Sequence, residues 1–266
     1  LSEDSVTKKF WIGSSSCLNE FDPVTFVNNR YYYPNEQLEF SDGIFVNEKD
    51  LLLACEYKVL LFDTHKKSFI QIPVFDEYNR LKDIGRIENV CRDNKGNFMV
   101  MSNAGVFFYN AEKKICERKI YGGPDFSFLN HYEVFNVKQD SHGYYWIATN
   151  KKGLIRYDMI TKKTVTVSLP NTIKNESLRF DIITEDSRGS IWAGSSNGLF
   201  KINTVSMLTE YFSEGSGLNY PEINAIMEDN NHLMWIGTVG GGINKMTPLN
   251  TGFKNFNLNK NGVGTY

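Results

Sequence analysis

The strongest constraint on this chain is a short pattern that recurs along it. An Asp is followed three residues later by Gly and six residues later by Trp, and a second Gly then opens an apolar run. The clear copies are Asp140, Gly143 and Trp146; Asp186, Gly189 and Trp192; and Asp229 and Trp235, with His232 in the place of the first Gly. A pattern that occurs several times in one chain cannot be a single active site, so we interpret these residues as a structural repeat.

Weaker copies extend the repeat over the whole chain. The positions equivalent to Trp are 11, about 52, 99, 146, 192 and 235, so the spacing is 41 to 47 residues. A period of this length, with several short strands in each unit, is typical of β-propeller blades. The sequence therefore predicts an all-β fold, a single β-propeller segment of about six four-stranded blades over residues 1–266. The blades are expected at 1–36, 37–80, 81–128, 129–174, 175–217 and 218–266.

Each unit divides into four short strand candidates. In the fifth unit they are Phe180–Thr184, Ile191–Gly194, Leu199–Ile202 and Leu208–Phe212, with Gly, Asn, Asp and Ser between them. We expect the repeated Asp to accept hydrogen bonds from backbone N–H groups of a tight turn, and the Gly to supply a positive φ. The Trp is expected on the second strand, where its large apolar surface packs between neighbouring blades.

The two ends of the chain do not match each other. Only ten residues precede Trp11, so the first blade is expected to lack its innermost strand. Near the other end, Phe253–Asn257 is a candidate fourth strand, and Leu258–Tyr266 follows it. Either this tail supplies the missing strand and closes a six-bladed ring, or the chain is an arc of a longer propeller. We favour an incomplete fragment of a larger propeller, because the tail is rich in Gly and poor in strand-forming residues.

Composition and spacing argue against several classes of function. Lys and Arg total 29 and Asp and Glu total 31, so there is no basic excess to attract nucleic acid. The four cysteines have no CxxC spacing and the four histidines stand alone, so no metal site is predicted. The Gly-rich run Gly237–Gly242 lacks the Lys-Ser/Thr ending of a phosphate loop and is expected to be a hairpin turn. Acidic residues are dispersed, so no catalytic residue and no cofactor are predicted.

The repeats resemble the regulator-propeller repeats of hybrid two-component sensors. The shared pattern is Asp-x-x-Gly-x-x-Trp-x-Gly-Ser/Thr, then Gly-Leu/Ile-x-Arg/Lys, and it is clearest in Asp140–Asp158, Asp186–Ile202 and Asp229–Met246. The resemblance implies the periplasmic sensor region of a membrane-spanning histidine kinase, which detects oligosaccharides and relays a signal to the kinase elsewhere in the protein. It implies a segment that binds and couples but is not an enzyme, and it is compatible with a homodimer.

A ligand is expected on the face that carries the connections between blades and the turns between second and third strands. Aromatic rings stack on the apolar faces of sugars, and Arg holds carboxylates or sulfates through paired N–H groups. The preferred candidates are Arg86, Tyr132 and Arg179, because they enter from neighbouring blades. Further ligand-binding candidates are His131, Tyr220, Glu222, Asn150, Lys151 and Asn197.

Two other functions stay open at this point. A protein-interaction scaffold in the manner of WD40 or kelch propellers fits the composition, although the repeats lack the Trp-Asp dipeptide and the paired glycines of those families. A polysaccharide lyase or hydrolase would need acid/base or metal groups that converge in a central channel, and no spacing in the sequence nominates them.

Overall fold

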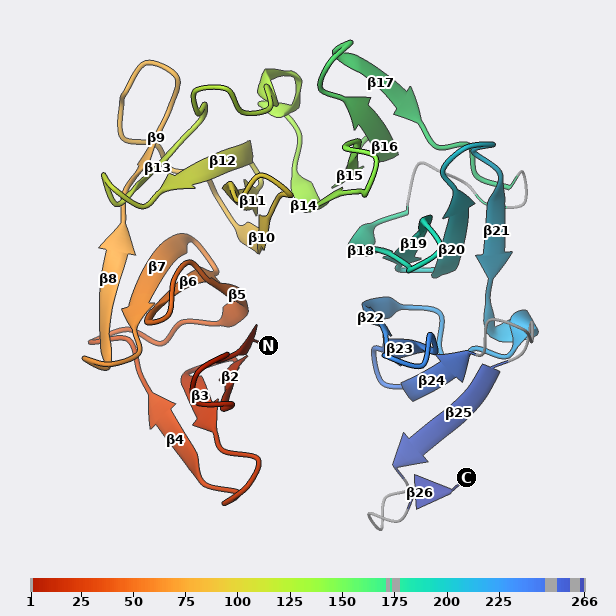
Figure 1. Cartoon of the computed structure of the whole chain (residues 1–266), viewed down its shortest axis with the longest axis horizontal. Helices are drawn as coiled ribbons and strands as arrows, with labels where there is room; N and C mark the ends of the chain where they lie inside the picture. Colours follow the sequence, from red (N-terminus) through yellow and green to blue (C-terminus); the bar gives the residue numbers. More distant parts are fainter. Residues whose placement is uncertain (1, 171–172, 174–177, 247–252, 259–263, 266) are drawn as a thin grey trace. The chain divides into compact units, whose positions relative to one another are not determined.

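The computed structural model describes residues 2–170, 173, 178–246, 253–258 and 264–265, with the backbone alone for 255–258 and 264–265. Apart from the short 3-10 turns η1 (Ser127–Leu129) and η3 (Glu214–Ser216), the regular structure of these residues is β. The strands form six sheets, each with four antiparallel strands that follow one another along the chain (Figure 1). The chain is thus a β-propeller of four-stranded blades, as the repeat predicts. It divides into two units, Leu1–Val134 and Phe135–Tyr266, which are described separately.

The first unit contains three blades. Blade 1 consists of β1 (Ser2–Glu3), β2 (Phe10–Gly13), β3 (Leu18–Phe21) and β4 (Asn28–Tyr31). Blade 2 consists of β5 (Phe40–Phe45), β6 (Asp50–Cys55), β7 (Lys58–Asp63) and β8 (Ser68–Ile72). Blade 3 consists of β10 (Ile87–Arg92), β11 (Phe98–Ser102), β12 (Gly105–Asn110) and β13 (Ile115–Glu117). The connection after blade 2 adds β9 (Val74–Phe75) to the outside of blade 3, parallel to β13.

The second unit also contains three blades. Blade 4 consists of β14 (Val134–Gln139), β15 (Tyr145–Thr149), β16 (Gly153–Asp158) and β17 (Lys163–Thr166). Blade 5 consists of β18 (Phe180–Glu185), β19 (Ser190–Ser195), β20 (Gly198–Asn203) and β21 (Thr209–Phe212). Blade 6 consists of β22 (Ile223–Glu228), β23 (Met234–Thr238), β24 (Gly242–Met246), β25 (Phe253–Leu258) and an added β26 (Gly264–Thr265). The four strands predicted for the fifth unit, and the strand predicted at Phe253–Asn257, are confirmed to within one residue at every end.

The ends of the chain differ from the prediction. Blade 1 does have its first strand, because Ser2 pairs with Trp11 and Glu3 pairs with Phe10. The expectation that this blade lacks its inner strand is therefore wrong, since a strand of two residues fits into the short segment before the turn. In the tail, β26 pairs with β25 of its own blade, with Asn257 opposite Thr265. Strand β26 thus extends blade 6 and does not supply a strand to blade 1.

The repeated Asp organises the turn between the first and second strands. In blade 5, Oδ1 of Asp186 accepts the backbone N–H groups of Arg188 and Ser190 at 3.0 and 2.8 Å, and Oδ2 accepts Nε1 of Trp192 at 2.8 Å. Asp140 and Asp229 make the same three bonds in blades 4 and 6, with Nε1 of Trp146 and Trp235 both at 2.8 Å. The third residue after the Asp has a positive φ in all three turns, 90° at Gly143, 77° at Gly189 and 60° at His232. The predicted backbone N–H bonds to the Asp and the positive φ of the Gly are confirmed. The hydrogen bond from the Trp indole to the same Asp was not predicted.

The blades without an Asp–Trp pair satisfy the same turn in other ways. In blade 3, where Met99 replaces Trp, the amide of Asn97 donates to Oδ2 of Asp93 at 2.7 Å. In blade 2 the equivalent pair is Val46 and Leu52, so apolar side chains replace both the Asp and the Trp. Replacing both partners of a hydrogen bond costs little stability, because no polar group is left without a partner.

Blade 1 is the exception to this pattern. Asp4 accepts the N–H groups of Val6 and Thr7, but its turn is one residue longer, because its own N–H reaches the carbonyl of Lys9, the fifth residue along. Nε1 of Trp11 is left without a hydrogen-bond partner among the described residues. In blade 1 an extra turn residue therefore separates the Asp carboxylate from the indole N–H, the two groups that form a hydrogen bond in blades 4 to 6.

The residues at the Trp position join each blade to the next one within a unit. Trp146 is fully buried and packs with Phe180 and Ile183 of blade 5, and Trp192 packs with Ile223 and Met234 of blade 6. In the first unit, Trp11 lies in one cluster with the apolar residues of blade 2, and Leu52 lies in one cluster with those of blade 3. The predicted packing of the second strand between blades is confirmed, and burial of these side chains supplies much of the adhesion between sheets.

Trp11 and Trp192 give a matched test of the Asp–Trp bond, because each is 2% exposed but only Trp192 has a partner for Nε1. We expect Trp192→Phe to lower the free energy of unfolding by more than Trp11→Phe, by about 1.5–3 kcal/mol, the usual contribution of a hydrogen bond to a charged group. Denaturant titration of both variants against the unaltered chain measures the difference. Equal losses would show that the bond adds nothing beyond the packing of the ring.

Candidate functional site

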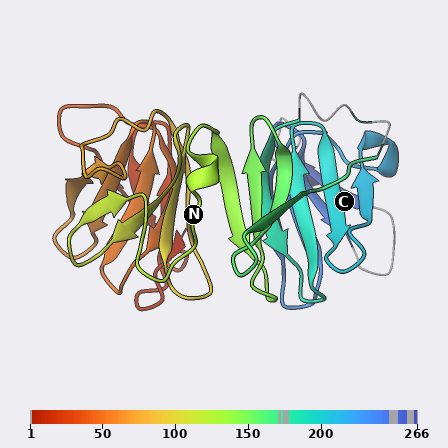
Figure 2. The same cartoon turned by 90° about the horizontal axis from the view of Figure 1, so that it is seen from above.

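The predicted ligand residues lie along one edge of the blades. Seen edge-on, the strands of each unit run between two opposite edges, where the connections are made (Figure 2). The turn between second and third strands meets the connection between blades, because its N–H donates to the carbonyl of the residue before the first strand: Asn103 to Arg86, Ser196 to Arg179, and Val239 to Glu222, at 2.9 to 3.0 Å. We call this the loop edge. The repeated Asp turns lie at the opposite edge.

A β-bulge marks the first strand of several blades at the loop edge. The register shifts after Phe40, Ile87, Phe180 and Ile223, which leaves one extra residue in each strand. The extra residues are all polar: Ser41, Glu88, Asp181 and Asn224. Bulges re-aim side chains and are frequent beside functional sites. These bulges were not predicted from the sequence. The repeated Arg-x-acid pattern of Arg86 to Glu88 and Arg179 to Asp181 marks two of them.

Arg179 is the best-defined predicted residue of the second unit. Its guanidinium lies 4.8 Å from the centre of the Phe135 ring and forms an ion pair with Asp181, while the side chain remains more than half exposed. Burial raises the pKa of Asp181, the Arg179 charge opposes that shift, and the negative charge of Glu222 adds to it. Of the predicted residues, Arg179 therefore pairs directly with the partly buried carboxylate of Asp181, and the charge of Glu222 acts on the same group. An exposed cation held over an aromatic ring is suited to a polar, anionic or sugar-like ligand.

Tyr220 is held in place by the Gly-rich turn of blade 6. A Cβ on Gly241 would lie 2.5 Å from Cβ of Tyr220, so only Gly permits this close approach. The preceding Asn219 donates its N–H to the buried Oδ1 of Asn244 at 3.0 Å and its amide to the carbonyl of Gly241 at 3.1 Å. The predicted hairpin turn over Gly237–Gly242 is confirmed, and its packing presents the Tyr220 ring, which is 43% exposed.

The other predicted residues of the second unit lie at separate hairpin tips. Asn150 and Lys151 are exposed in the β15–β16 turn of blade 4. Asn197 is exposed in the β19–β20 turn of blade 5, where its carbonyl accepts the hydroxyl of Tyr211 at 2.6 Å. All three are on the loop edge, but on two different blades.

In the first unit, Arg86, His131 and Tyr132 come from the connections that flank blade 3. Nε of Arg86 is 3.7 Å from Glu88, and its side chain is about half exposed. His131 is exposed, whereas Tyr132 is partly buried and its N–H donates to the carbonyl of Leu129 at 2.9 Å. Arg86 and Tyr132 belong to one unit and Arg179 to the other, so the preferred three candidates are described as two separate groups.

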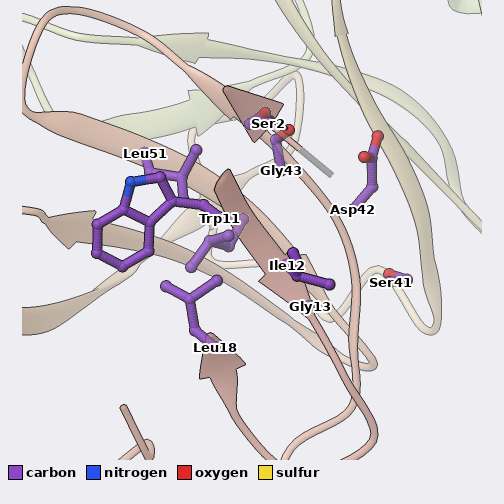
Figure 3. A pocket seen from close by; sticks show the side chains of 10 residues that line it. Ser2, Trp11, Ile12, Gly13, Leu18, Ser41, Asp42, Gly43 and Leu51 are labelled. Atoms are coloured by element: carbon purple, nitrogen blue, oxygen red, sulfur yellow. Dashed lines mark hydrogen bonds between the residues drawn. The ribbon is translucent and has the colours of Figure 1, made fainter. Parts of the chain in front are cut away.

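Two cavities lie outside the predicted set. One, at the loop edge of blade 3, has a volume of about 120 Å³ and is lined by Glu77, Arg118, Lys119, Ser127 and Asn130. The other, about 60 Å³, lies between blades 1 and 2 (Figure 3), where Ser2 Oγ donates to the carbonyl of Gly43 at 2.6 Å. Its Asp42 accepts the N–H of Val90 at 3.3 Å, and burial raises the pKa of that carboxyl. We interpret this second cavity as part of the joint between the first strands.

The described residues hold no group of three or more His, Cys, Asp or Glu side chains arranged to bind a metal ion. Among the same residues, no helix is long and apolar enough to cross a membrane.

Comparison with known proteins decides the type of repeat. Residues 217–240, from the connection before blade 6 to its Gly-rich turn, match the family described as "Two component regulator propeller". This segment is similar to a regulator propeller repeat. The match covers the Asp229–Trp235 turn and confirms the resemblance predicted from the sequence. No curated protein matches the chain in sequence.

Solved structures share the propeller fold of this chain at low identity. The extracellular domain described as part of a hybrid two component system of B. thetaiotaomicron has a TM-score of 0.56 and 16% identity, over 92% of this chain and 37% of that one. A second such domain from B. thetaiotaomicron gives 0.55 and 17%, over 98% and 40%. Virginiamycin B lyase from Staphylococcus aureus gives 0.65 and 13%, over 98% and 80%. At these identities the likeness shows the propeller fold alone, and the chain spans about two fifths of the two hybrid-system domains.

Gly240 and Gly241 give a matched test of how the regulator propeller repeat positions Tyr220. In Gly241→Ala the new Cβ would lie 2.5 Å from Tyr220, so we expect the connection to move, whereas a Cβ on Gly240 meets nothing within 4 Å. Gly240→Ala carries only the backbone strain of its positive φ, about 1–2 kcal/mol. NMR should show large shifts of the Asn219 and Tyr220 amides in the Gly241 variant alone. Similar shifts in both variants would contradict this role of Gly241.

Proposed function

We propose that this chain is an extracytoplasmic, periplasmic ligand-sensing propeller of a hybrid two-component sensor. It binds oligosaccharides at its loop edge and passes a signal to a histidine kinase elsewhere in a membrane-spanning protein. The observation that carries the proposal is the regulator propeller repeat at residues 217–240. The similar extracellular domains of hybrid two component systems support the same assignment at the level of fold.

The chemistry of the loop edge supports a sugar as the ligand class. Tyr220 offers an exposed aromatic ring, and Arg179 offers an exposed guanidinium held over Phe135. Rings of this kind stack on the apolar faces of sugars, while the guanidinium and the amides of Asn150 and Asn197 donate to hydroxyl or carboxylate oxygens. The loop edge differs from blade to blade, whereas the Asp turns repeat. The edge that varies is the one suited to recognition.

The opposite edge offers a route by which blades of the second unit act together. Ser141 of blade 4 donates its hydroxyl to Glu185 of blade 5 at 2.6 Å, and Ser187 of blade 5 donates to Glu228 of blade 6 at 2.6 Å. The backbone N–H of each Ser binds the second oxygen of the same carboxylate. In this proposal a ligand that displaces one blade also displaces its neighbour, and the segment couples binding to output without turnover of the ligand.

Arg179 and Arg188 provide the test of the binding edge. Both are exposed residues of the blade 5 region, but Arg188 lies in the Asp turn at the opposite edge. We expect Arg179→Ala to weaken binding of the best oligosaccharide by about tenfold or more, the loss of one charge-assisted hydrogen bond, and Arg188→Ala to leave it unchanged. A glycan array followed by calorimetry on the chain and on the full-length protein measures the affinities.

Several results would contradict the proposal. If no glycan binds either protein, or if only proteins bind, a scaffold role in the manner of WD40 or kelch propellers replaces it. Equal losses in the two Arg variants would remove the loop edge as the binding surface. Cleavage of a polysaccharide by the purified chain would indicate a lyase or hydrolase.

A further inference from the structure

Arg118 is a buried cation whose hydrogen bonds are incomplete. Its side chain is 7% exposed, and its Nε has no hydrogen-bond partner among the described residues. Buried charges in proteins are normally paired and hydrogen-bonded, because an unpaired one loses its hydration without compensation. Burial accordingly lowers the pKa of Arg118. A buried guanidinium with an unused N–H donor is unusual in a folded protein.

The position of Arg118 is fixed by the strand that it follows and by the ring beneath it. It comes directly after β13, and its guanidinium carbon lies 3.9 Å from the centre of the buried Phe107 ring. Nη1 makes a long bond of 3.5 Å to the carbonyl of Val106. One face and one end of the guanidinium are thereby occupied, and Arg118 lines the 120 Å³ pocket at the loop edge. A fork held rigidly in this way loses little freedom when it binds a planar oxyanion.

The carboxylates near the pocket pair only loosely with Arg118. The nearest carboxylate, Glu77, is 3.9 Å from Nε, beyond hydrogen-bond distance, and its side chain is 38% exposed. Asp76 is already engaged by Arg80, with Nε and Nη2 at 2.9 and 2.8 Å. Lys119 adds a second positive charge to the lining. The remaining wall is formed by Ser127 and Asn130, whose hydroxyl and amide groups can donate to oxygen.

We propose that this pocket binds an oxyanion, a carboxylate or sulfate group, through the guanidinium of Arg118 with help from Lys119, Ser127 and Asn130. The volume holds a small oxyanion or several water molecules. The anion displaces Glu77, whose exposed side chain is free to turn toward solvent, and completes the pairing of Arg118. In the sensor, the pocket selects oligosaccharides that carry an acidic group, a step that rests on the proposed function. Oxyanion binding itself does not.

The direct test follows the Nε–Hε signal of Arg118 by NMR. The chain is titrated with sodium sulfate, glucuronate and glucose 6-sulfate, with glucose as the neutral control. We expect the anions to shift this signal with dissociation constants on the order of 1 mM or below, and glucose to leave it unchanged. Sulfate alone tests the pocket. Glucuronate and glucose 6-sulfate test whether a carboxylate or a sulfate ester is the preferred group.

Two substitutions that are expected to change anion binding in opposite directions make the test sharper. Arg118→Met should weaken anion binding by about tenfold or more, followed at the amides of Ser127 and Asn130. Glu77→Gln should strengthen it by about threefold, because it removes the competing carboxylate. Lys95→Gln is the matched control: Lys95 is an exposed cation of blade 3 in the turn at the opposite edge, and its substitution should leave binding unchanged.

The proposal is overturned if no anion shifts the Arg118 signal in the unaltered chain, a measurement that does not depend on whether Arg118→Met folds. It is also overturned if Glu77→Gln weakens binding, since Glu77 would then be part of the site. If sulfate binds but neither acidic sugar binds more tightly than sulfate, the oxyanion pocket stands and its assignment to acidic oligosaccharides fails. Binding of neutral oligosaccharides alone would leave the sensor function and remove the pocket from it.

Discussion

The rest of the structure depends on a carboxylate that makes three hydrogen bonds at once. One oxygen of the repeated Asp closes the turn between the first and second strands, and the other holds the indole of the Trp at the second strand. The same indole fills the space against the next blade. A local turn and the packing between sheets are therefore fixed by one group, which explains why Asp and Trp recur with constant spacing in blades 4 to 6.

The two edges of the blades have different physical demands. At the Asp edge blades 2 to 6 meet the same demand in few ways: an Asp–Trp bond, an Asn97 side chain in its place, or the apolar pair of Val46 and Leu52. Blade 1, with its longer turn, is the exception. At the loop edge the backbone bonds between turn and connection repeat, but the side chains repeat only in part, as in the Arg-x-acid pattern of blades 3 and 5. Polar residues at the bulges and in the connections are free to differ between blades, and that freedom is what a recognition surface requires.

The strands, the turns and the interblade position of the Trp could be predicted, because all three rest on local rules that repeat with the period of the chain. The first strand of blade 1 was missed, since two residues before a turn carry too little pattern to be read as a strand. The bulges were missed because they change the register by one residue without changing the strand composition. Arg179 and Glu222 were selected as loop residues, but the ion pair of Arg179 with Asp181 at the bulge was not foreseen.

The sequence by itself determined the number of blades, their turns and the kind of repeat, because each follows from residues within one period. Only the tertiary structure decided which side chains meet at the loop edge. The pocket of Arg118 is lined by Glu77, Lys119, Ser127 and Asn130, and Phe107 lies beneath the guanidinium; these residues lie in different connections and strands and share no motif. Whether a buried cation keeps an N–H group without a hydrogen bond depends on all of these at once, and no spacing in the chain records it.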